Sequence, residues 1–167
     1  MDPHAPPDHG PRAAHVWRAE PREAAVVANL LAAFRNHLGF DWPSDDSFLA
    51  SVERLIEDPT TEYLLGAARA GDPPAGVVQL RFRWSVWRAA EDCELEDLFV
   101  SPRARRGGLG RALVAATIDR ARARGCRRIK LDTAERNDAA VPLYRSFGFS
   151  DEAYEGGRAM LLRLALD

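Results

Sequence analysis

The sequence predicts a single α/β domain, in which helices cover both faces of a mixed sheet. Its 167 residues are 46% hydrophobic, which is enough for one core. Some segments repeat apolar residues every three or four positions, as amphipathic helices do. Others alternate apolar with polar residues or run apolar throughout, as strands do. The two kinds of segment are interleaved without a dividing linker, and that order favours one sheet with helices on both faces.

The first half of the chain predicts a strand, two helices and a pair of strands. Pro21 suits the first turn of a helix, and Gly39 ends that helix. Ser44 is a good cap for the second helix, which closes before Pro59. The expected elements are a strand over 14–20, helices over 21–38 and 44–58, and strands over 62–70 and 75–85 joined by a turn.

The second half predicts more alternation of strands and helices. Gly125 caps a long helix and Gly148 stops a short one. A closing hairpin is expected across Gly156 and Gly157. The expected elements are a strand over 93–100, a helix over 109–124, a strand over 128–132, a helix over 139–147, and strands over 149–154 and 159–165. The full order is therefore β-α-α-β-β-β-α-β-α-β-β.

Composition restricts the classes of partner. The net charge of -2 gives no reason to expect nucleic acid or an anionic membrane, and no apolar run approaches the roughly 20 residues of a membrane span. Residues 1–12 are rich in proline and histidine and lack an apolar signal core, so we expect a disordered tail, a folded domain over 13–167 and a cytoplasmic location. Lys130 is the only lysine, which we interpret as GC-rich, bacterial coding.

Cysteine and histidine predict no metal site. Cys93 and Cys126 have neither metal-binding nor redox spacing, so we expect two reduced, buried thiols. The four histidines form no zinc-like cluster; they are His4, His9, His15 and His37.

The most informative segment is the glycine-rich run 105–111, Arg-Arg-Gly-Gly-Leu-Gly-Arg. It follows the strand expected over 93–100 and opens the long helix. Glycines let the backbone come close to a phosphate, and the first N–H groups of a helix point at the anion. We therefore expect a phosphorylated ligand here.

Two familiar phosphate loops fit this run poorly. A Walker loop needs Gly-Lys-Ser/Thr, but Gly110 is followed by Arg111 and Ala112. A dinucleotide fingerprint needs a small residue where Leu113 stands, although Asp132 lies at about the distance of a ribose-binding acid. The dinucleotide interpretation is therefore weak, but it stays open.

The run does fit the pattern Arg-x-x-Gly-x-Gly, which resembles the coenzyme A pyrophosphate loop of the GNAT superfamily of N-acetyltransferases. The resemblance extends over residues 93–149, about the C-terminal half of the chain. The matching features are Arg105, Gly108 and Gly110 in the loop, the strand and turn over 95–102 before it, and Asn137, Tyr144, Gly148 and Phe149 after it.

The resemblance implies a fold and a ligand. In the GNAT fold the fourth and fifth strands splay apart, and acetyl-coenzyme A, the co-substrate, lies in the gap. Backbone groups of Leu98, Phe99 and Val100 would bind its pantetheine arm like an added strand, and a backbone N–H there would stabilise the oxyanion. The loop would hold the pyrophosphate through its N–H groups, the positive helix end and its arginines. The loop residues are Arg105, Arg106, Gly107, Gly108, Leu109, Gly110 and Arg111.

Glu94, Glu96 and Asp97 are unusual in a strand that helices should cover, because an unpaired buried carboxylate is costly. Strict alternation places Glu94 and Glu96 on one face of the strand and Asp97 on the other. Leu98 and Val100 would share the face of the glutamates, unless a bulge near Leu98 shifts the register.

An alkylammonium ion must lose a proton before it can attack a thioester, so a base is needed. Glu96 matches the carboxylate given this role in diamine acetyltransferases, directly or through water. The alternative is a strand-end carboxylate satisfied by arginine or backbone. Glu94 and Asp97 are weaker candidates for the same role, and Asp132 and Glu135 are possible substitutes.

Tyr144 is the expected general acid. A phenol, with an ordinary pKa of about 10, stays protonated at neutral pH and can donate to the departing thiolate, as the resemblance implies. The alternative is an aromatic side chain that only packs. Asn137 would hydrogen-bond the pantetheine or its surroundings, or else cap the short helix.

Two loops are expected to contact the acceptor: one holds Phe40, Asp41 and Trp42, and the other is 84–87. Aromatic and acidic side chains suit a cationic or amphipathic amine, although core packing explains the tryptophans equally well.

The leading hypothesis is direct acetyl transfer from acetyl-coenzyme A to a small primary amine, such as a polyamine, an amino acid or an aminoglycoside-like compound. A covalent enzyme intermediate is disfavoured because no cysteine or serine is placed as a nucleophile. The alternatives are acetylation of a protein N-terminus or lysine, and a regulatory module that binds acyl-coenzyme A without turnover. No metal is expected, and the resemblance suggests a homodimer.

Overall fold

The computed structural model describes residues 13–153 and 155–166, so the tail expected over 1–12 lies outside the described residues. The elements in chain order are β1 (His15–Arg18), the 3-10 turn η1 (Pro21–Glu23), α1 (Ala24–His37), α2 (Asp45–Leu55), β2 (Thr61–Ala67), β3 (Gly76–Ser85), β4 (Ala90–Val100), the 3-10 turn η2 (Pro102–Ala104), α3 (Leu109–Ala123), β5 (Arg128–Lys130) and α4 (Ala140–Ser146).

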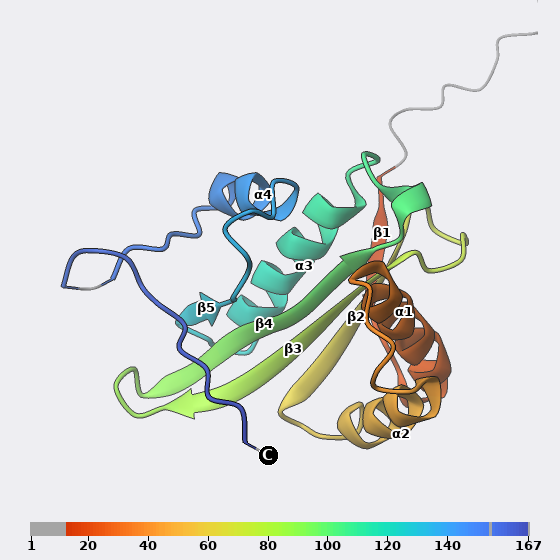
Figure 1. Ribbon diagram of the computed structural model, residues 1–167, viewed down its shortest axis with the longest axis horizontal. Coiled ribbons are helices and arrows are strands. Elements are labelled where there is room, and N and C mark those ends of the chain that lie inside the picture. The colour runs from red at the N-terminus through yellow and green to blue at the C-terminus, as the bar shows by residue number, and fades with distance from the viewer. Residues whose placement is uncertain (1–12, 154, 167) are drawn as a thin grey trace, which may run out of the picture.

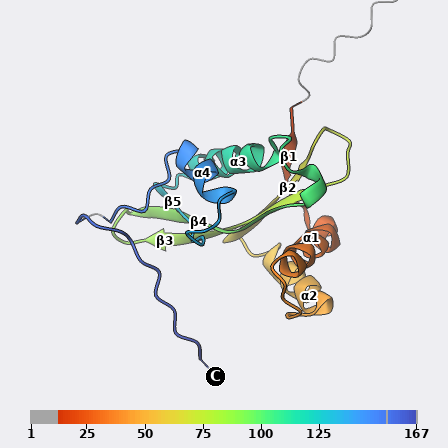
Figure 2. The same ribbon diagram turned by 45° about the horizontal axis from the view of Figure 1, so that its top comes forward.

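The five strands form one mixed sheet in the order β1-β2-β3-β4-β5. Neighbouring strands are antiparallel except for β4 and β5, which are parallel. Helices α1 and α2 cover one face and α3 and α4 the other, as Figures 1 and 2 show. The α/β class and the two covered faces are therefore confirmed.

The sequence signals at the starts of the first two helices act as expected. Pro21 stands at the first position of η1, and Glu20 and Glu23 form a capping box there. The hydroxyl of Ser44 accepts a hydrogen bond of 3.2 Å from the backbone N–H of Ser47 and so caps α2.

Two glycines let α3 approach the sheet closely. Gly66 of β2 and Gly76 of β3 are cross-strand partners. A Cβ atom at either position would stand 2.8 Å from a leucine of α3, Leu109 at Gly66 and Leu113 at Gly76. The small residues that close helix–strand packing requires therefore lie on the strands. This explains how the bulky Leu113 is accommodated near the start of the helix.

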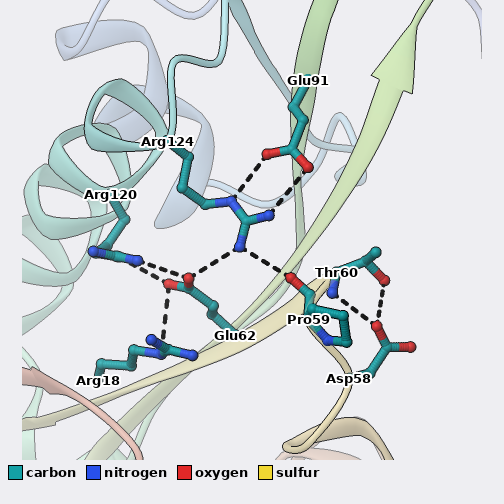
Figure 3. A network of polar contacts seen from close by, with 8 residues as sticks. All are labelled: Arg18, Asp58, Pro59, Thr60, Glu62, Glu91, Arg120 and Arg124. Carbon is teal, nitrogen blue, oxygen red and sulfur yellow. Dashed lines mark hydrogen bonds and ion pairs between the residues drawn. The ribbon is translucent and has the colours of Figure 1, made fainter.

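A buried carboxylate anchors the C-terminal half of α3 (Figure 3). The side chain of Glu62 on β2 is only 2% exposed, and its oxygens accept hydrogen bonds of 2.7 and 2.8 Å from Arg120. Arg124 bonds the same carboxylate at 3.3 Å and also Glu91 of β4 at 3.0 Å, and Arg18 of β1 lies 3.9 Å away. The network therefore ties α3 to three strands.

The prediction of two strands over 149–154 and 159–165, joined in a closing hairpin, is wrong. The chain does reverse near Gly156 and Gly157, but among the described residues only the isolated bridge between Glu152 and Arg158 forms. Beyond Ala159, whose N–H bonds the carbonyl of Asp151, the described backbone pairs with no other strand. A ladder needs a neighbour at hydrogen-bonding distance, and this segment leaves the sheet on the side of α1 and α2 (Figure 2).

Candidate active site

The fourth and fifth strands part after a short contact. Pairing between β4 and β5 is confined to Asp92–Glu94 against Arg128–Lys130, and β5 ends there instead of continuing to residue 132. Residues 95–100 of β4 pair with β3 on one side only, so the other backbone edge is open. The splay expected of this fold is therefore present, and it exposes the backbone of Leu98, Phe99 and Val100 on that edge.

The open edge leads directly into the glycine-rich loop. Arg106 and Gly108 have φ angles of 67° and 82°, a left-handed conformation that turns the chain into α3 at Leu109. A Cβ atom added at Gly107 or Gly110 would meet nothing closer than 3.9 and 3.6 Å, respectively. A Cβ atom at Gly108 would meet nothing within 4 Å, so open space lies beside the first helical N–H groups, which have no partner within the helix. The loop therefore has the form of an anion cradle.

Two arginines of the loop already have protein partners. The Nε of Arg105 donates to the carbonyl of Val100 at 3.0 Å, which braces the loop against the end of β4. Arg111 donates to the hydroxyl of Ser146 at 3.0 Å and lies 5.0 Å above the ring of Phe147, which joins α3 to α4. Both side chains therefore shape the loop, a task that their spacing in the sequence does not reveal.

A bulge at Glu96 changes the faces of β4. Gln79 pairs with Asp97 and the next residue, Leu80, pairs with Leu95, so Glu96 is the extra residue. The assignment of Leu98 to the face of Glu94 is therefore wrong. Leu95 and Leu98 both belong to the core under α3. In a strictly alternating strand, residues three positions apart would lie on opposite faces. A bulge near Leu98 was the alternative to strict alternation, and the bulge occurs two residues earlier, at Glu96.

The bulge brings Glu96 beside a buried polar row. Tyr63, Gln79 and Asp97 are successive partners across β2, β3 and β4, and the Gln79 amide donates to the carboxylate of Glu96 at 2.6 Å. The hydroxyl of Tyr63 is buried without a hydrogen-bond partner among the described residues. Burial, and then the charges of Glu96 and Asp97, raise the pKa of this phenol.

The sequence reasoning did not single out Tyr63 and Gln79. The signal that could have found them is a polar group beside an apolar run in each strand, Tyr63 before Leu64 and Leu65, and Gln79 between Val78 and Leu80. Their place in the row depends on strand register, which the sequence does not fix.

Asp97 is the carboxyl group with the most perturbed acidity in the row. Burial first, and then the negative charges of Glu96 and Asp132, raise its pKa to about 6. The group therefore changes charge within one unit of neutral pH, the range in which acid–base catalysis works best.

Tyr144 lies on α4 and is 8% exposed, and its ring packs edge-on against Phe149 with the ring centroids 5.7 Å apart. Burial raises the pKa of its phenol, so it stays protonated well above neutral pH. The side-chain oxygen of Asn137 accepts a bond of 3.2 Å from the N–H of Ala140, and its amide contacts Thr133. This contact at the start of α4 favours the capping alternative for Asn137.

A cleft of about 600 Å³ is lined mainly by residues of β3, β4 and β5. It holds charges of both signs, and two aromatic rings form part of its wall. Its lining residues are Thr60, Arg81, Phe82, Arg83, Trp84, Glu91, Asp92, Glu94, Glu96 and Lys130. The predicted acceptor contact Trp84 and the predicted base Glu96 therefore share one cleft.

Other predicted acceptor contacts lie outside this cleft. Phe40 and Trp42 are exposed in the connection between α1 and α2, and Trp87 is fully exposed at the tip between β3 and β4. The substitute bases Asp132 and Glu135 are ion-paired with Arg163 and Arg158 of the C-terminal segment.

Both cysteines are free thiols, Cys93 buried and Cys126 half-buried. In the described part of the chain, no group of three or more histidine, cysteine, aspartate or glutamate side chains could hold a metal ion. None of the helices within 13–153 and 155–166 is long and apolar enough to cross a membrane.

Comparison with known proteins places this geometry among acetyltransferases. The family model described as Acetyltransferase (GNAT) family matches residues 26–149. An aminoglycoside N(6')-acetyltransferase type 1 of Stenotrophomonas maltophilia is 28% identical over 155 residues, which are 91% of this chain and 94% of that protein. A thialysine N-epsilon-acetyltransferase of Caenorhabditis elegans is 30% identical over 99 residues, 59% of this chain and 61% of its own.

Solved structures agree with the fold. The structure of a protein from Arthrobacter sp. FB24, whose description assigns it to the acetyltransferases, superimposes with a TM-score of 0.79 and 31% identity. It covers 91% of this chain and 95% of its own. An aminoglycoside acetyltransferase from an uncultured soil metagenomic sample has a TM-score of 0.76 at 15% identity, covering 92% of this chain and 97% of its own.

Proposed function

Because the chain belongs to the acetyltransferase (GNAT) family and is an N-acetyltransferase that uses acetyl-coenzyme A, we propose that it acetylates a primary amine of a small molecule by direct attack. The observation that carries the proposal is the open edge of β4, which runs from the bulge at Glu96 into the glycine loop. One continuous edge therefore offers a carboxylate, a backbone ladder and an anion cradle.

The donor half of the site uses backbone groups. Leu98, Phe99 and Val100 would pair with the pantetheine arm along the open edge of β4. The N–H groups at the start of α3 and the loop 105–111 would hold the pyrophosphate, with Arg106 as the loop arginine most free to reach it. The side-chain oxygen of Asn137 would have to give up its hydrogen bond from the N–H of Ala140 before it could bind the pantetheine instead.

The acceptor half needs a base. The bulged carboxylate of Glu96 is exposed to the cleft and held by Gln79, so it can take a proton from the substrate ammonium, directly or through water. The freed amine nitrogen attacks the thioester carbonyl carbon, and the carbon–sulfur bond breaks. The Tyr144 phenol gives its proton to the departing thiolate, and the second proton that the attacking nitrogen loses returns to the phenolate, so coenzyme A leaves as the thiol and the nitrogen becomes a neutral amide.

The lining of the cleft supports a small acceptor. Glu94 and Glu96 suit an ammonium group, while Arg81 and Arg83 on β3 suit an anionic or hydroxyl-rich part of the same molecule. Two of the relatives are named for small amine acceptors, an aminoglycoside and thialysine. A polyamine without any anionic or polar group fits these arginines less well.

The test is a thiol-release assay with acetyl-coenzyme A over a panel of amines that includes a polyamine, amino acids, an aminoglycoside and a lysine peptide. Turnover of one small amine is expected, and turnover of the peptide alone would instead assign a protein substrate. A thermal shift with coenzyme A against NAD checks the donor. Stabilisation by NAD alone would overturn the proposal.

Glu96→Gln tests the base, with Glu53→Gln, at an exposed glutamate of α2 outside the cleft, as its matched control. General-base loss lowers kcat by about 100-fold or more, whereas the control should stay within about threefold. An unchanged rate and pH profile in Glu96→Gln would assign the base elsewhere, and Asp97 would be the next candidate.

A further inference from the structure

A row of alternating charges crosses the cleft. Arg81 of β3 and Lys130 of β5 are both cross-strand partners of Glu94 on β4, one on each side of it. All three residues line the cleft. Cross-strand partners point to the same face of a sheet, so the row places one carboxylate between two cations.

Two other acidic residues of the cleft lining already have protein partners. Asp92 is ion-paired with Arg128 and, at 3.5 Å, with Arg88. Glu91 is held by Arg124 at 3.0 Å. The charges of these two carboxylates are therefore compensated within the protein.

The row at Glu94 is not compensated in this way. Within the residues that the structure describes, Arg81, Glu94 and Lys130 form no ion pair within 4.0 Å. Asp58 is close enough for its charge to interact with that of Arg81, but its carboxylate instead accepts bonds of 2.7 Å from Thr60 (Figure 3). Arg81 and Lys130 are nevertheless half-buried. A cation that is partly removed from water without a partner is unfavourable, so this arrangement favours the binding of an anionic group.

The uncompensated charges of the cleft lining have both signs. They are three cations, Arg81, Arg83 and Lys130, and two carboxylates, Glu94 and Glu96. A simple amine would pair with the carboxylates and leave the cations without partners. A molecule that carries both an ammonium group and a carboxylate pairs with both sets, and the planar fork of an arginine matches a carboxylate in two hydrogen bonds.

We propose that the acceptor is an amine that also carries a carboxylate, as an amino acid does, and that Arg81 binds this carboxylate. The inference rests on the proposed function, in which Glu96 takes the proton from the amine, and it names the class of the small molecule. Glu96 lies two residues beyond Glu94, roughly 7 Å along β4 from the row that holds Arg81. An arginine side chain is long enough to cover most of that separation, so one small molecule can contact both groups. Polyamines and aminoglycosides carry ammonium groups without a carboxylate and should be poor acceptors.

The first test compares acids with amides in the thiol-release assay with acetyl-coenzyme A. The acceptors are L-alanine, L-lysine and L-tryptophan, each against its carboxamide, with cadaverine and an aminoglycoside as amines that lack a carboxylate. At least one acid should exceed its amide in kcat/KM by about 10- to 100-fold, as expected for one charge-assisted pair. The same acid should exceed cadaverine and the aminoglycoside.

The second test assigns the preference to a residue. Arg81→Gln should raise the KM of the preferred acid at least about 10-fold, while the KM of its amide and the KM of acetyl-coenzyme A stay within about twofold. A purely structural role of Arg81 would change all three together. Arg81→Lys keeps the charge without the fork and should recover part of the loss. Arg122→Gln, at an exposed arginine of α3 outside the cleft, is the matched control and should leave every constant unchanged.

The outcomes separate this inference from the function on which it rests. Equal turnover of acids and amides, or a preferred acid whose KM is the same in Arg81→Gln, would overturn the inference and leave the proposed function standing. Absence of turnover with every amine would overturn the proposed function. Binding of the same acids and amides to the chain saturated with coenzyme A, measured by calorimetry, then decides the inference alone: an acid should bind at least about 10-fold more tightly than its amide and lose this advantage in Arg81→Gln, and equal binding would overturn it.

Discussion

Glu62 offers the sharpest test of how α3 is held. We expect Glu62→Gln to destabilise the protein by about 2–3 kcal/mol. Removing one partner of a buried ion pair costs about 3–5 kcal/mol when the remaining charge is fully buried. Here the side chains of Arg120 and Arg124 are 34% and 23% exposed. Water therefore partly solvates them, and the loss of stability is smaller. Arg124 also keeps its bonds to Glu91.

The assay is urea and thermal unfolding. For a chain of this size, each kcal/mol shifts the melting temperature by about 2–4 °C, so the expected fall is roughly 4–12 °C. The matched control is Asp119→Asn, which breaks a surface pair at 4.0 Å whose side chains are 79% and 77% exposed. That change should cost less than about 0.5 kcal/mol.

The pH dependence of the difference is the second readout. Burial alone would raise the pKa of Glu62, but hydrogen bonds from Arg120 and the charges of Arg120 and Arg18 outweigh it and hold the pKa below its ordinary 4.5. Stabilisation by a group with a lowered pKa is complete above the ordinary value and is lost as the pH falls through the folded value. The gap between the natural chain and Glu62→Gln should therefore be widest near pH 7 and should narrow below about 4.5. A gap no larger than the Asp119→Asn control at pH 7 would refute the reasoning.

Three further predictions concern packing and catalysis. Gly76→Ala should cost about 1–3 kcal/mol in urea unfolding, because its Cβ would stand 2.8 Å from Leu113 and 3.3 Å from the carbonyl of Phe99; an unchanged midpoint would contradict the close approach. Tyr144→Phe should lower kcat by about 100-fold while coenzyme A affinity is kept, and an unchanged rate at every pH would remove the phenol from the mechanism. Asp97, with its pKa raised to about 6, carries above that pH a negative charge that interacts with the proposed base Glu96 and makes it more basic, so kcat/KM should fall as the pH drops through about 6; Asp97→Asn should abolish this inflection, and an inflection that persists must come from another group.

Much of the fold follows from local patterns. The capping signals at Pro21 and Ser44 predict helix starts that the structure confirms, because a cap depends on neighbours within a few residues. The order of elements up to α4 is confirmed for the same reason. The final strand over 159–165 was predicted wrongly. Its alternation is sound, but a strand exists only where another strand accepts its hydrogen bonds.

The candidate site divides in the same way. The glycine loop could be found from the sequence, since Gly108 needs a left-handed backbone and glycine adopts one readily. The faces of β4 could not, because one inserted residue at Glu96 reverses every side chain that follows it, and only pairing with β3 reveals the insertion. The partnership of Tyr63, Gln79 and Asp97 depends on the same register.

The sequence by itself determined the family, the order of the elements up to α4 and the glycine-rich loop, because these depend on residues that are close together along the chain. Tertiary structure decided which carboxylates meet in the cleft, which arginines already have partners and where the C-terminal segment 159–166 lies. These features depend on contacts between distant segments, such as Glu62 with Arg120 and Gln79 with Glu96. Pairing energies of that kind are set by distance and burial, which appear only once the sheet and its helices are assembled.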